Sequence, residues 1–491
     1  METLNNPCSL EQELAQKGNE LEALRKMREL QMVDLTLRSI EEKVESKSGE
    51  IIEMMTASKG QCQGALRELV IREILRSADG HLWCREYVEK LRSDQHVWIY
   101  TGTNWEQVEP QQWKDFVGRC AERCGLPESQ CMNQTFMKAL YEGVAFNLAE
   151  YRRQAVPDGE VWLNLHNGTL VLSKDGNMLL REHNKEDLFT YTLPYSYDDQ
   201  AECPLWHRFL DRVLPEPEAQ MVLGEFIGYC LMPRHTLEKM LWLYGDGQNG
   251  KSVTLEVIEA LLGSFNVSYL SLEDLTNDEV KRAGFESKML NISHESGRDV
   301  NANVLKQITS GERVLVKYLY RDPYETRDYG KCAAAFNTMP RAELTFGYFR
   351  RLIIMPYLVT IPEEEKDDML ADKLRQELSG ILNWVLQLLS GLMTRRAFTE
   401  SECCKKALDL YRLQSDNVRL FLNEMCEQSE FTTVASEIYK SYRNYCVDSS
   451  LKPVGKQKFF QRLEGLGYNR VMYGNLLHFN LKVNGNEQTV F

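Results

Sequence analysis

The chain has 491 residues, of which 43% are hydrophobic and 26% are charged, and its formal net charge is −14. This length exceeds a single hydrophobic core, so we predict several domains of an ordinary globular protein, and the acidic charge excludes a surface that is cationic throughout. The longest apolar stretch, residues 381–393, is too short and too mixed to cross a bilayer, and the N-terminus lacks the pattern of a signal peptide, so we expect a cytoplasmic protein without membrane contact.

Residues 1–60 are predicted to be helical. Apolar residues recur at alternating spacings of three and four, the pattern of a short coiled coil. The same pattern is typical of an amphipathic helix that packs on its own domain, and the sequence supports both interpretations about equally. The residues of this seam are Leu30, Val33, Leu37, Ile40 and Val44.

Residues 61–235 are predicted to form an α+β domain. We expect a strand, a turn and a second strand over 97–105, and a helix over 111–124. A hairpin is predicted around the turn formed by Asn167 and Gly168.

Three cysteines of this domain, Cys120, Cys124 and Cys131, stand close together in the sequence. Metal sites usually show paired CxxC knuckles or a nearby histidine pair, and neither is present here. We therefore predict reduced thiols that serve as small core residues.

The most specific motif follows a predicted buried strand, residues 240–244. The next eight residues read GDGQNGKS and fit the pattern G-x-x-x-x-G-K-[ST] without a mismatch, and a helix with one apolar face follows. Glycines let backbone N–H groups converge on phosphate oxygens, and the helix N-terminus adds its positive dipole end. The predicted phosphate loop consists of Gly245, Asp246, Gly247, Gln248, Asn249, Gly250, Lys251 and Ser252.

Within this loop, Lys251 is predicted to bring a positive charge to the β- and γ-phosphates of ATP, and Ser252 to offer its hydroxyl to Mg²⁺. Glu295 ends a second apolar strand, where a carboxylate can hold Mg²⁺ through water or orient the attacking water. In nucleotide sites of this kind a second acidic residue usually precedes this carboxylate, but here that position is His294. Glu295 alone would therefore hold Mg²⁺ and orient the attacking water. Asn337 ends a third strand, where an amide can hydrogen-bond the γ-phosphate or the attacking water.

Two basic features surround that third strand. Residues 313–320 alternate as a strand that runs to a turn, and the hairpin would present Lys317 and Arg321 to a nucleic-acid backbone. Arg350 and Arg351 precede a further apolar strand. One of them could reach into the site of a neighbouring subunit and stabilise charge in the transition state, and the sequence does not choose between them.

Residues 416–491 are predicted to form helices followed by a two-stranded wing, which favours a winged-helix module. Within residues 431–491 basic residues outnumber acidic ones, in an otherwise acidic chain. We expect DNA contacts from Lys458 and Arg462, on a predicted recognition helix over 457–466, and from Lys456 directly before it.

The order of these features resembles superfamily 3 helicases, in particular the phage, plasmid and poxvirus primase-helicase group. The resemblance covers about residues 85–480, and its most specific parts are the phosphate loop and the Asn337-x-x-Pro340 motif. Further segments similar to this group are residues 167–168, 193–198, 203–206, 228–229, 381–384 and 439–468.

The expected fold is α/β. The resemblance implies a central P-loop ATPase domain of AAA+-like type with a parallel sheet over 236–365, and a helical segment over 366–415. Within that segment the sequence pattern predicts one long helix over 372–393. An α+β N-terminal domain and a C-terminal winged helix would flank this centre.

The resemblance also implies a hexameric ring on single-stranded DNA that unwinds forked DNA with ATP and Mg²⁺. Lys251, Ser252, Glu295 and Asn337 would act within one subunit, and Arg350 or Arg351 would act in trans. We find no Asp-x-Asp or Asp-x-Glu pair at the end of an apolar strand in residues 1–230, so no primase domain is expected.

The leading hypothesis is therefore a DNA helicase for the replication of a phage, plasmid or other mobile element. An ATP-regulated origin-binding or loading protein without processive unwinding is the alternative. A monomeric phosphate-loop kinase is a third hypothesis, which the paired arginines, the basic hairpin and the C-terminal tail oppose. Residues 1–60 could bind a primase, an initiator protein or nothing.

Overall fold

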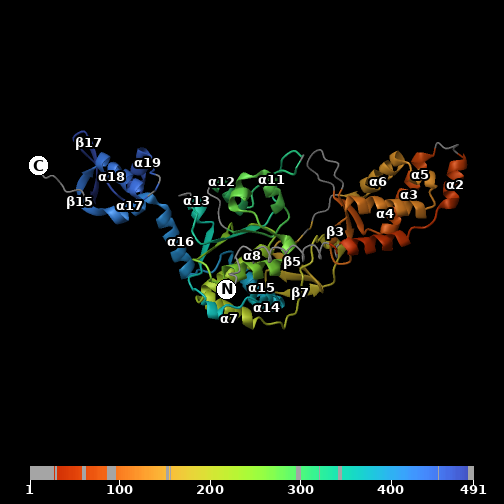
Figure 1. Ribbon diagram of the computed structural model, residues 1–491, viewed down its shortest axis with the longest axis horizontal. Coiled ribbons are helices and arrows are strands. Elements are labelled where there is room, and N and C mark those ends of the chain that lie inside the picture. The colour runs from red at the N-terminus through yellow and green to blue at the C-terminus, as the bar shows by residue number, and fades with distance from the viewer. Residues whose placement is uncertain are drawn as a thin grey trace, which may run out of the picture. The chain divides into compact units, whose positions relative to one another are not determined.

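The computed structural model describes residues 27, 30–57, 62–85, 96–150, 154, 156–294, 300–319, 321–340, 346–449, 451 and 453–484. The chain divides into two compact units, Met1–Tyr197 and Asp198–Phe491, and both combine helices with strands (Figure 1). Among the described residues, no helix has the length and apolar character that a membrane span requires. The finer domain boundaries predicted above stay predictions.

The first part of the N-terminal unit is helical and shares one hydrophobic core. Residues 30–42 are helical, and Val33, Leu37, Ile40 and Val44 are buried in this core. The apolar seam therefore packs on its own domain, as the second interpretation predicted. The helices that follow are α2 (Ser48–Ala57), α3 (Gln63–Ala78), α4 (Pro110–Arg123), α5 (Glu128–Cys131) and α6 (Gln134–Leu148).

Cysteines contribute to this core as predicted. Cys120 and Cys124 are buried, and burial raises the pKa of the Cys124 thiol to about 12. Within the described part of the chain, no group of three or more His, Cys, Asp or Glu side chains could hold a metal ion.

Two small sheets complete the N-terminal unit. One has the strand order β3-β2-β1-β4, and the other is an antiparallel sheet with the order β5-β6-β7. The predicted hairpin around Asn167 is confirmed, because Leu165 pairs with Gly168 at its turn. The elements are β1 (Leu82–Arg85), β2 (His96–Tyr100), β3 (Trp105–Gln107), β4 (Ala149–Glu150), β5 (Glu160–Leu165), β6 (Gly168–Ser173), β7 (Met178–Arg181) and η1 (Lys185–Asp187).

The second unit is built around a five-stranded parallel sheet with the order β14-β8-β13-β10-β9. Its strands are β8 (Met240–Tyr244), β9 (Val267–Ser268), β10 (Leu290–His294), β13 (Lys331–Phe336) and β14 (Leu352–Pro356), and a separate antiparallel pair is formed by β11 (Val314–Val316) and β12 (Tyr324–Thr326). The helices are α7 (Pro204–Val213), α8 (Pro217–Leu231), α9 (Lys251–Leu262), η2 (Ser264–Asn266), α10 (Leu272–Asn277), α11 (Glu279–Arg282), η3 (Ala283–Phe285), α12 (Ala302–Thr309), α13 (Phe346–Phe349), η4 (Glu363–Glu365), α14 (Leu370–Arg375), α15 (Leu378–Arg395) and α16 (Glu402–Ser415).

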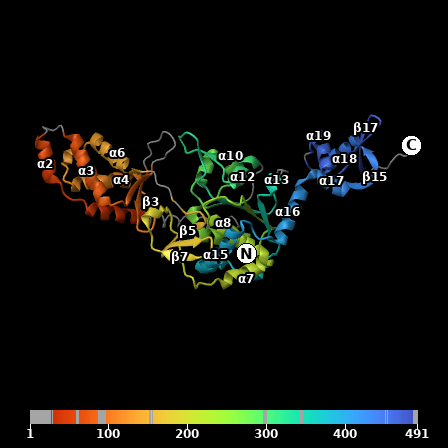
Figure 2. The same cartoon turned by 180° about the vertical axis from the view of Figure 1, so that it is seen from behind.

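Helices cover both faces of this sheet, as expected for parallel strands. Trp242, Phe336 and Ile354 pack on one face against α10, α12, α13 and α16. Successive side chains of a strand alternate, so Leu241 and Leu243 point to the other face, which α9 covers with its own buried residues. The helices α8 and α15 lie side by side, which Figure 1 and Figure 2 both show.

Two sequence predictions need correction here. The single helix expected over 372–393 is divided into α14 and α15 at Glu377, whose carboxylate accepts hydrogen bonds from the backbone N–H groups of Leu205 and Trp206 and so caps α7. The strand expected over 313–320 is only β11, because the N–H of Lys317 donates to the carbonyl of Glu279. At both breaks the chain makes hydrogen bonds with residues distant in the sequence.

The C-terminal part of this unit has its own hydrophobic core. Three helices surround an antiparallel sheet with the order β15-β17-β16, of which β15 was not predicted. The winged-helix assignment stays a prediction. The elements are α17 (Asn417–Met425), β15 (Cys426–Val434), α18 (Ala435–Asp448), α19 (Lys456–Gly465), β16 (Arg470–Tyr473) and β17 (Leu476–Val483).

Candidate functional site

The loop 245–250 lies at the carboxyl edge of the parallel sheet, between β8 and α9. The N–H of Gly245 donates to the carbonyl of Phe336, the last residue of the neighbouring strand β13 (3.1 Å). Strand, loop and helix thus follow in the order that a phosphate loop needs. Ligands of open parallel sheets bind beyond the carboxyl ends of the strands, so this edge is the candidate site.

Two glycines allow the loop to approach its neighbours closely. A Cβ atom at Gly245 would lie 2.2 Å from the carbonyl oxygen of Tyr357. Gly250 has a φ of 86°, in the left-handed region, and a Cβ atom there would lie 2.8 Å from Cγ1 of Val213. Larger residues would displace the loop at either position, so both glycines are required for its conformation.

Lys251 begins α9, and its side chain turns back over the loop. Its ammonium donates to the carbonyl oxygen of Gly245 (2.5 Å) and to Oδ1 of Asn249 (3.1 Å). The residue is 7% exposed, and this burial lowers the pKa of the ammonium, while the carboxylate of Asp246 acts in the opposite direction. An ammonium has three N–H donors, so these two bonds orient the group and leave one donor for a phosphate oxygen.

A brace formed by residues 357–361, directly after β14, holds the loop and was not predicted. The amide Nδ2 of Asn249 donates to the carbonyl of Tyr357 (3.0 Å), whose hydroxyl donates to Oγ1 of Thr254 in α9 (3.0 Å). The N–H of Ile361 donates to the carbonyl of Gln248 (2.8 Å). The only signal for the brace in the sequence is that it follows a strand adjacent to β8.

The residues of the loop and of the first turn of α9 fit a nucleoside triphosphate with Mg²⁺. The cation of Lys251 and the N-terminus of α9 complement phosphate charge, and Ser252 presents an exposed side chain in the first turn of the helix. Hydroxyl and phosphate oxygens are ligands that suit Mg²⁺.

Two further predicted residues follow strands at the same edge. Asn337 is exposed directly after β13, beside the strand that leads into the loop. The strand β10 ends at His294, which pairs with Ala335 and is therefore level with the end of β13. Glu295 is the next residue of the chain and lies outside the described residues.

Arg350 and Arg351 lie at the opposite, amino edge of the sheet, since Met240 pairs with the first residue of β14. The guanidinium of Arg351 is 11% exposed and donates to Oγ of Ser310 (2.7 Å) and to the carbonyl of Gly347 (2.5 Å). Arg350 is 44% exposed and pairs with Glu238 (2.5 Å). The contacts of Arg351 give its side chain a structural role, whereas the side chain of Arg350 is the more accessible of the two.

The loop 317–323 connects β11 with β12 and carries the predicted cations of the hairpin. Lys317 and Arg321 are half-buried, and the guanidinium of Arg321 lies 6.0 Å from the ring centroid of Tyr318. Leu319 is 68% exposed, and Tyr318 is also exposed. The loop thus combines exposed apolar and aromatic side chains with two cations.

The three basic residues predicted on α19 differ in their surroundings. Lys456 and Lys458 are exposed. Arg462 donates to Oδ2 of Asp416 (2.6 Å), a buried carboxylate that also caps α17. Arg462 therefore has a structural partner, whereas the two lysines are accessible to a ligand.

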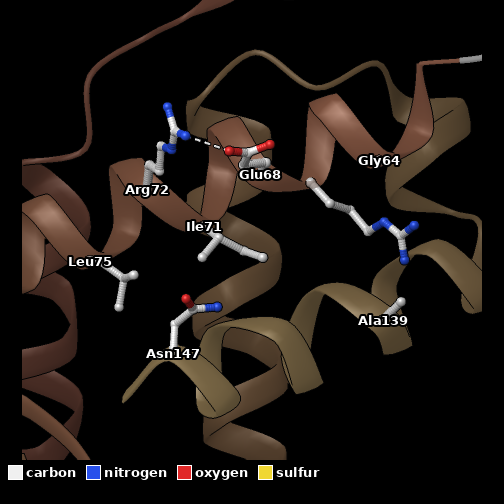
Figure 3. A pocket seen from close by; sticks show the side chains of 8 residues that line it. Gly64, Glu68, Ile71, Arg72, Leu75, Ala139 and Asn147 are labelled. Carbon is white, nitrogen blue, oxygen red and sulfur yellow. Dashed lines mark hydrogen bonds and ion pairs between the residues drawn. The ribbon is translucent and has the colours of Figure 1, made fainter. Parts of the chain in front are cut away.

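A groove of about 470 Å³ lies in the N-terminal unit between α3 and α6. Figure 3 shows Ile71 and Leu75 from α3 and Asn147 from α6 along it, and an ion pair between Glu68 and Arg72. It has no nucleophile and no pair of carboxylates, so it offers no catalytic arrangement.

Comparison with known proteins relates separate parts of the chain to different families. Residues 243–351 match the model of a family of unknown function (DUF5906), and residues 80–215 match a model described as D5 N terminal like. Over 197 residues the chain is 22% identical to a protein of Acanthamoeba polyphaga mimivirus named "Putative helicase L207/L206"; this match covers 37% of the chain and 20% of that relative.

Solved structures of the NrS-1 C-terminal region in the apo form are also similar to this chain. Two of them have a TM-score of 0.46 with 10% and 11% identity, over 84% of this chain and 99% and 98% of theirs.

Proposed function

We propose that the protein is an ATP-dependent DNA helicase of the superfamily 3 kind that acts in the replication of a phage, plasmid or other mobile element. In this proposal it works as a hexameric ring on single-stranded DNA and uses ATP and Mg²⁺. The similarity to the mimivirus protein named as a helicase and the match to the D5 N terminal like model support this direction.

One observation carries the proposal. The ammonium of Lys251 is buried and oriented by two oxygens within a glycine-containing loop, at the edge of a parallel sheet where β13 and β10 also end. A buried lysine has a desolvation cost, which a bound phosphate would offset by charge. The arrangement therefore supports a nucleotide ligand.

Each residue of the site would have a separate task. When bound, ATP would supply the phosphoryl group for transfer to water and Mg²⁺ a Lewis acid beside it. Backbone N–H groups of the loop and Lys251 would hold the phosphate oxygens, and Ser252 would face the metal. The amide of Asn337 would orient the attacking water, and Glu295 would act as the catalytic acid residue of the site.

DNA would contact two regions of the second unit. Lys317, Arg321 and the aromatic residues beside them would hold the backbone and bases of a single strand. Lys456 and Lys458 would contact phosphates from α19.

ATP hydrolysis provides the first test. We expect the wild type to hydrolyse ATP faster with single-stranded DNA and to form a ring-sized particle, measured by light scattering in the same buffer. Lys251→Ala should abolish hydrolysis, and the exposed lysine of α6 gives a matched control, Lys138→Ala, which should behave as the wild type. Hydrolysis by a monomer that DNA does not affect would contradict the helicase proposal.

The alternative, an ATP-regulated origin-binding or loading protein, is favoured by one observation. The C-terminal part has a hydrophobic core of its own and exposes Lys456 and Lys458 on a helix, an arrangement suited to duplex DNA. Strand displacement on forked DNA separates the two functions, because only a helicase releases the displaced strand with ATP.

A further inference from the structure

The hairpin β11–β12 is attached to α10 by a buried arginine, Arg282, at the end of α11. Its guanidinium donates to three backbone carbonyls: Nε to Leu275 (2.6 Å), Nη2 to Thr276 (2.9 Å) and Nη1 to Leu315 in β11 (2.6 Å). Arg282 is buried, and burial lowers the pKa of its guanidinium. A planar fork with five N–H donors suits three carbonyls in different directions, and a lysine ammonium would not reproduce this geometry.

The carbonyls of Leu275 and Thr276 belong to α10. This helix and the short segment before it are bonded to the chain directly before and directly after residues 295–299, which lie outside the described residues. Before them, Oγ of Ser293 in β10 donates to the carbonyl of Leu270 (2.7 Å), directly ahead of α10. After them, the N–H of Asn301 donates to Oγ1 of Thr276 (3.1 Å). Arg282 therefore connects the hairpin with a helix that is bonded to both sides of the segment containing Glu295.

Glu286 makes a second attachment. Its carboxylate accepts a hydrogen bond from the hydroxyl of Tyr318 (3.0 Å), in the exposed loop of the hairpin, and another from the hydroxyl of Tyr324. From Glu286 the chain runs through Met289, whose carbonyl accepts the N–H of Lys331 in β13, directly into β10. The hairpin is thus bonded to the segment that leads into β10 as well as to α10.

We propose that Arg282 and Glu286 are positioning residues that transmit the state of the nucleotide edge to the hairpin and, in the other direction, the binding of DNA to the nucleotide edge. This inference rests on the proposed function. Neither residue touches nucleotide or DNA in it: each acts through hydrogen bonds that fix the hairpin relative to β10. A coupling of this kind is reciprocal, so a variant that breaks it should lose stimulation by DNA without losing either binding site.

The test uses the full chain, ATP and oligo(dT), and compares ATP hydrolysis with and without the oligonucleotide. Arg282→Lys keeps the charge but not the three bonds to carbonyls. Glu286→Ala removes the carboxylate that accepts from the hydroxyls of Tyr318 and Tyr324 and leaves every side chain of the hairpin unchanged. Lys281→Gln, which removes an exposed cation from the same helix that pairs with Asp274, is the matched control.

We expect both variants to keep the basal rate, the KM for ATP and the affinity for oligo(dT) within about twofold of the wild type. Their stimulation ratio should fall to about one, whereas the control keeps the wild-type ratio. If both variants are stimulated like the wild type, the coupling is overturned and the helicase proposal stands. If Arg282→Lys loses basal activity and thermal stability while Glu286→Ala is fully stimulated, Arg282 is only structural and the inference is also overturned. A wild type without ATP hydrolysis would instead overturn the proposed function itself.

Discussion

Asn249 is a residue whose two side-chain atoms have different partners. Its Nδ2 donates to the carbonyl of Tyr357, and its Oδ1 accepts from Lys251. Among side chains of this length, an amide is the group that supplies both a donor and an acceptor in this arrangement. Asn249 therefore has a specific role in the loop. The side chain therefore orients Lys251 and fixes the loop to the brace at the same time.

Replacing this amide by a carboxylate should weaken nucleotide binding. In Asn249→Asp an acceptor oxygen would replace the donor Nδ2 and face the carbonyl oxygen of Tyr357, and a negative charge would stand beside the predicted phosphate site. We expect about tenfold weaker binding, or about 1.4 kcal/mol, in a titration with a fluorescent ATP analogue. Asp246→Asn, which removes a charge from an exposed position of the same loop, should not weaken binding. Equal affinities of Asn249→Asp and the wild type would show that the amide has no such role.

The stability of the second unit should depend on pH through the side chain of His235. Its Nε2 donates to the carbonyl of Tyr329 (3.0 Å), and burial together with the charge of Lys331 lowers the pKa of the imidazole to about 4. In the unfolded chain the pKa is about 6.5, so between these values only the unfolded state binds the proton. Stability from this group is therefore present above pH 6.5 and is lost as the pH falls towards 4.

We expect a contribution of about 2 kcal/mol to disappear between neutral pH and pH 5. Thermal denaturation at a series of pH values measures it, with His235→Gln as the comparison, because glutamine keeps an N–H donor and does not titrate. The wild type should lose more stability than the variant over this interval. Parallel curves for the two proteins would contradict the assignment.

At the scale of elements, the strands that position the candidate site could be predicted from the sequence. The strands β8 and β13 are short, mainly apolar runs, followed by Gly245 and by Asn337 respectively, and the phosphate-loop pattern fixes where α9 begins. The brace and the break before α15 could not be predicted in this way. Both involve a few hydrogen bonds between residues far apart in the chain, such as the two that Glu377 accepts from the start of α7, and such bonds leave no periodic pattern.

In α19 the sequence also could not distinguish a structural basic residue from an accessible one. The spacing of the basic residues does not show which of them has a buried partner. Arg462→Ala should destabilise the C-terminal part by about 2 kcal/mol, because the buried carboxylate of Asp416 would lose the charged hydrogen bond that it accepts from Arg462. Lys456→Ala and Lys458→Ala should leave the melting temperature unchanged. In a DNA titration over a range of salt concentrations, each lysine variant should reduce the salt slope by about one. If the lysine variants bind DNA with the wild-type slope, α19 is not a DNA-binding helix.

At the scale of the whole molecule, the two edges of the parallel sheet carry different parts of the predicted machinery. The phosphate loop and Asn337 lie at the carboxyl edge, whereas Arg350 lies at the amino edge of the same subunit. Residues at opposite edges of one sheet cannot both contact one nucleotide. If Arg350 acts on ATP at all, it must therefore act on the nucleotide of another subunit, through a head-to-tail interface.

Mixing two inactive variants tests this arrangement. Lys251→Ala lacks a working loop but keeps Arg350, and Arg350→Ala has the reverse defect, so each should be inactive alone. In an equal mixture about a quarter of the interfaces would combine an intact loop with an intact arginine, because a head-to-tail interface takes one element from each subunit. We therefore expect ATP hydrolysis to return on mixing, at a protein concentration where assembly is seen by light scattering.

A matched mixture of Lys251→Ala with Asn337→Ala gives the control, since both residues belong to the same edge of one subunit and no interface between those two chains restores a site. Activity in the first mixture and none in the second would assign Arg350 to the neighbouring subunit. Full activity of Arg350→Ala alone would exclude it, and because Arg351 is bonded to Ser310 and Gly347 within its own subunit, neither arginine of the pair would then remain available for a role in trans.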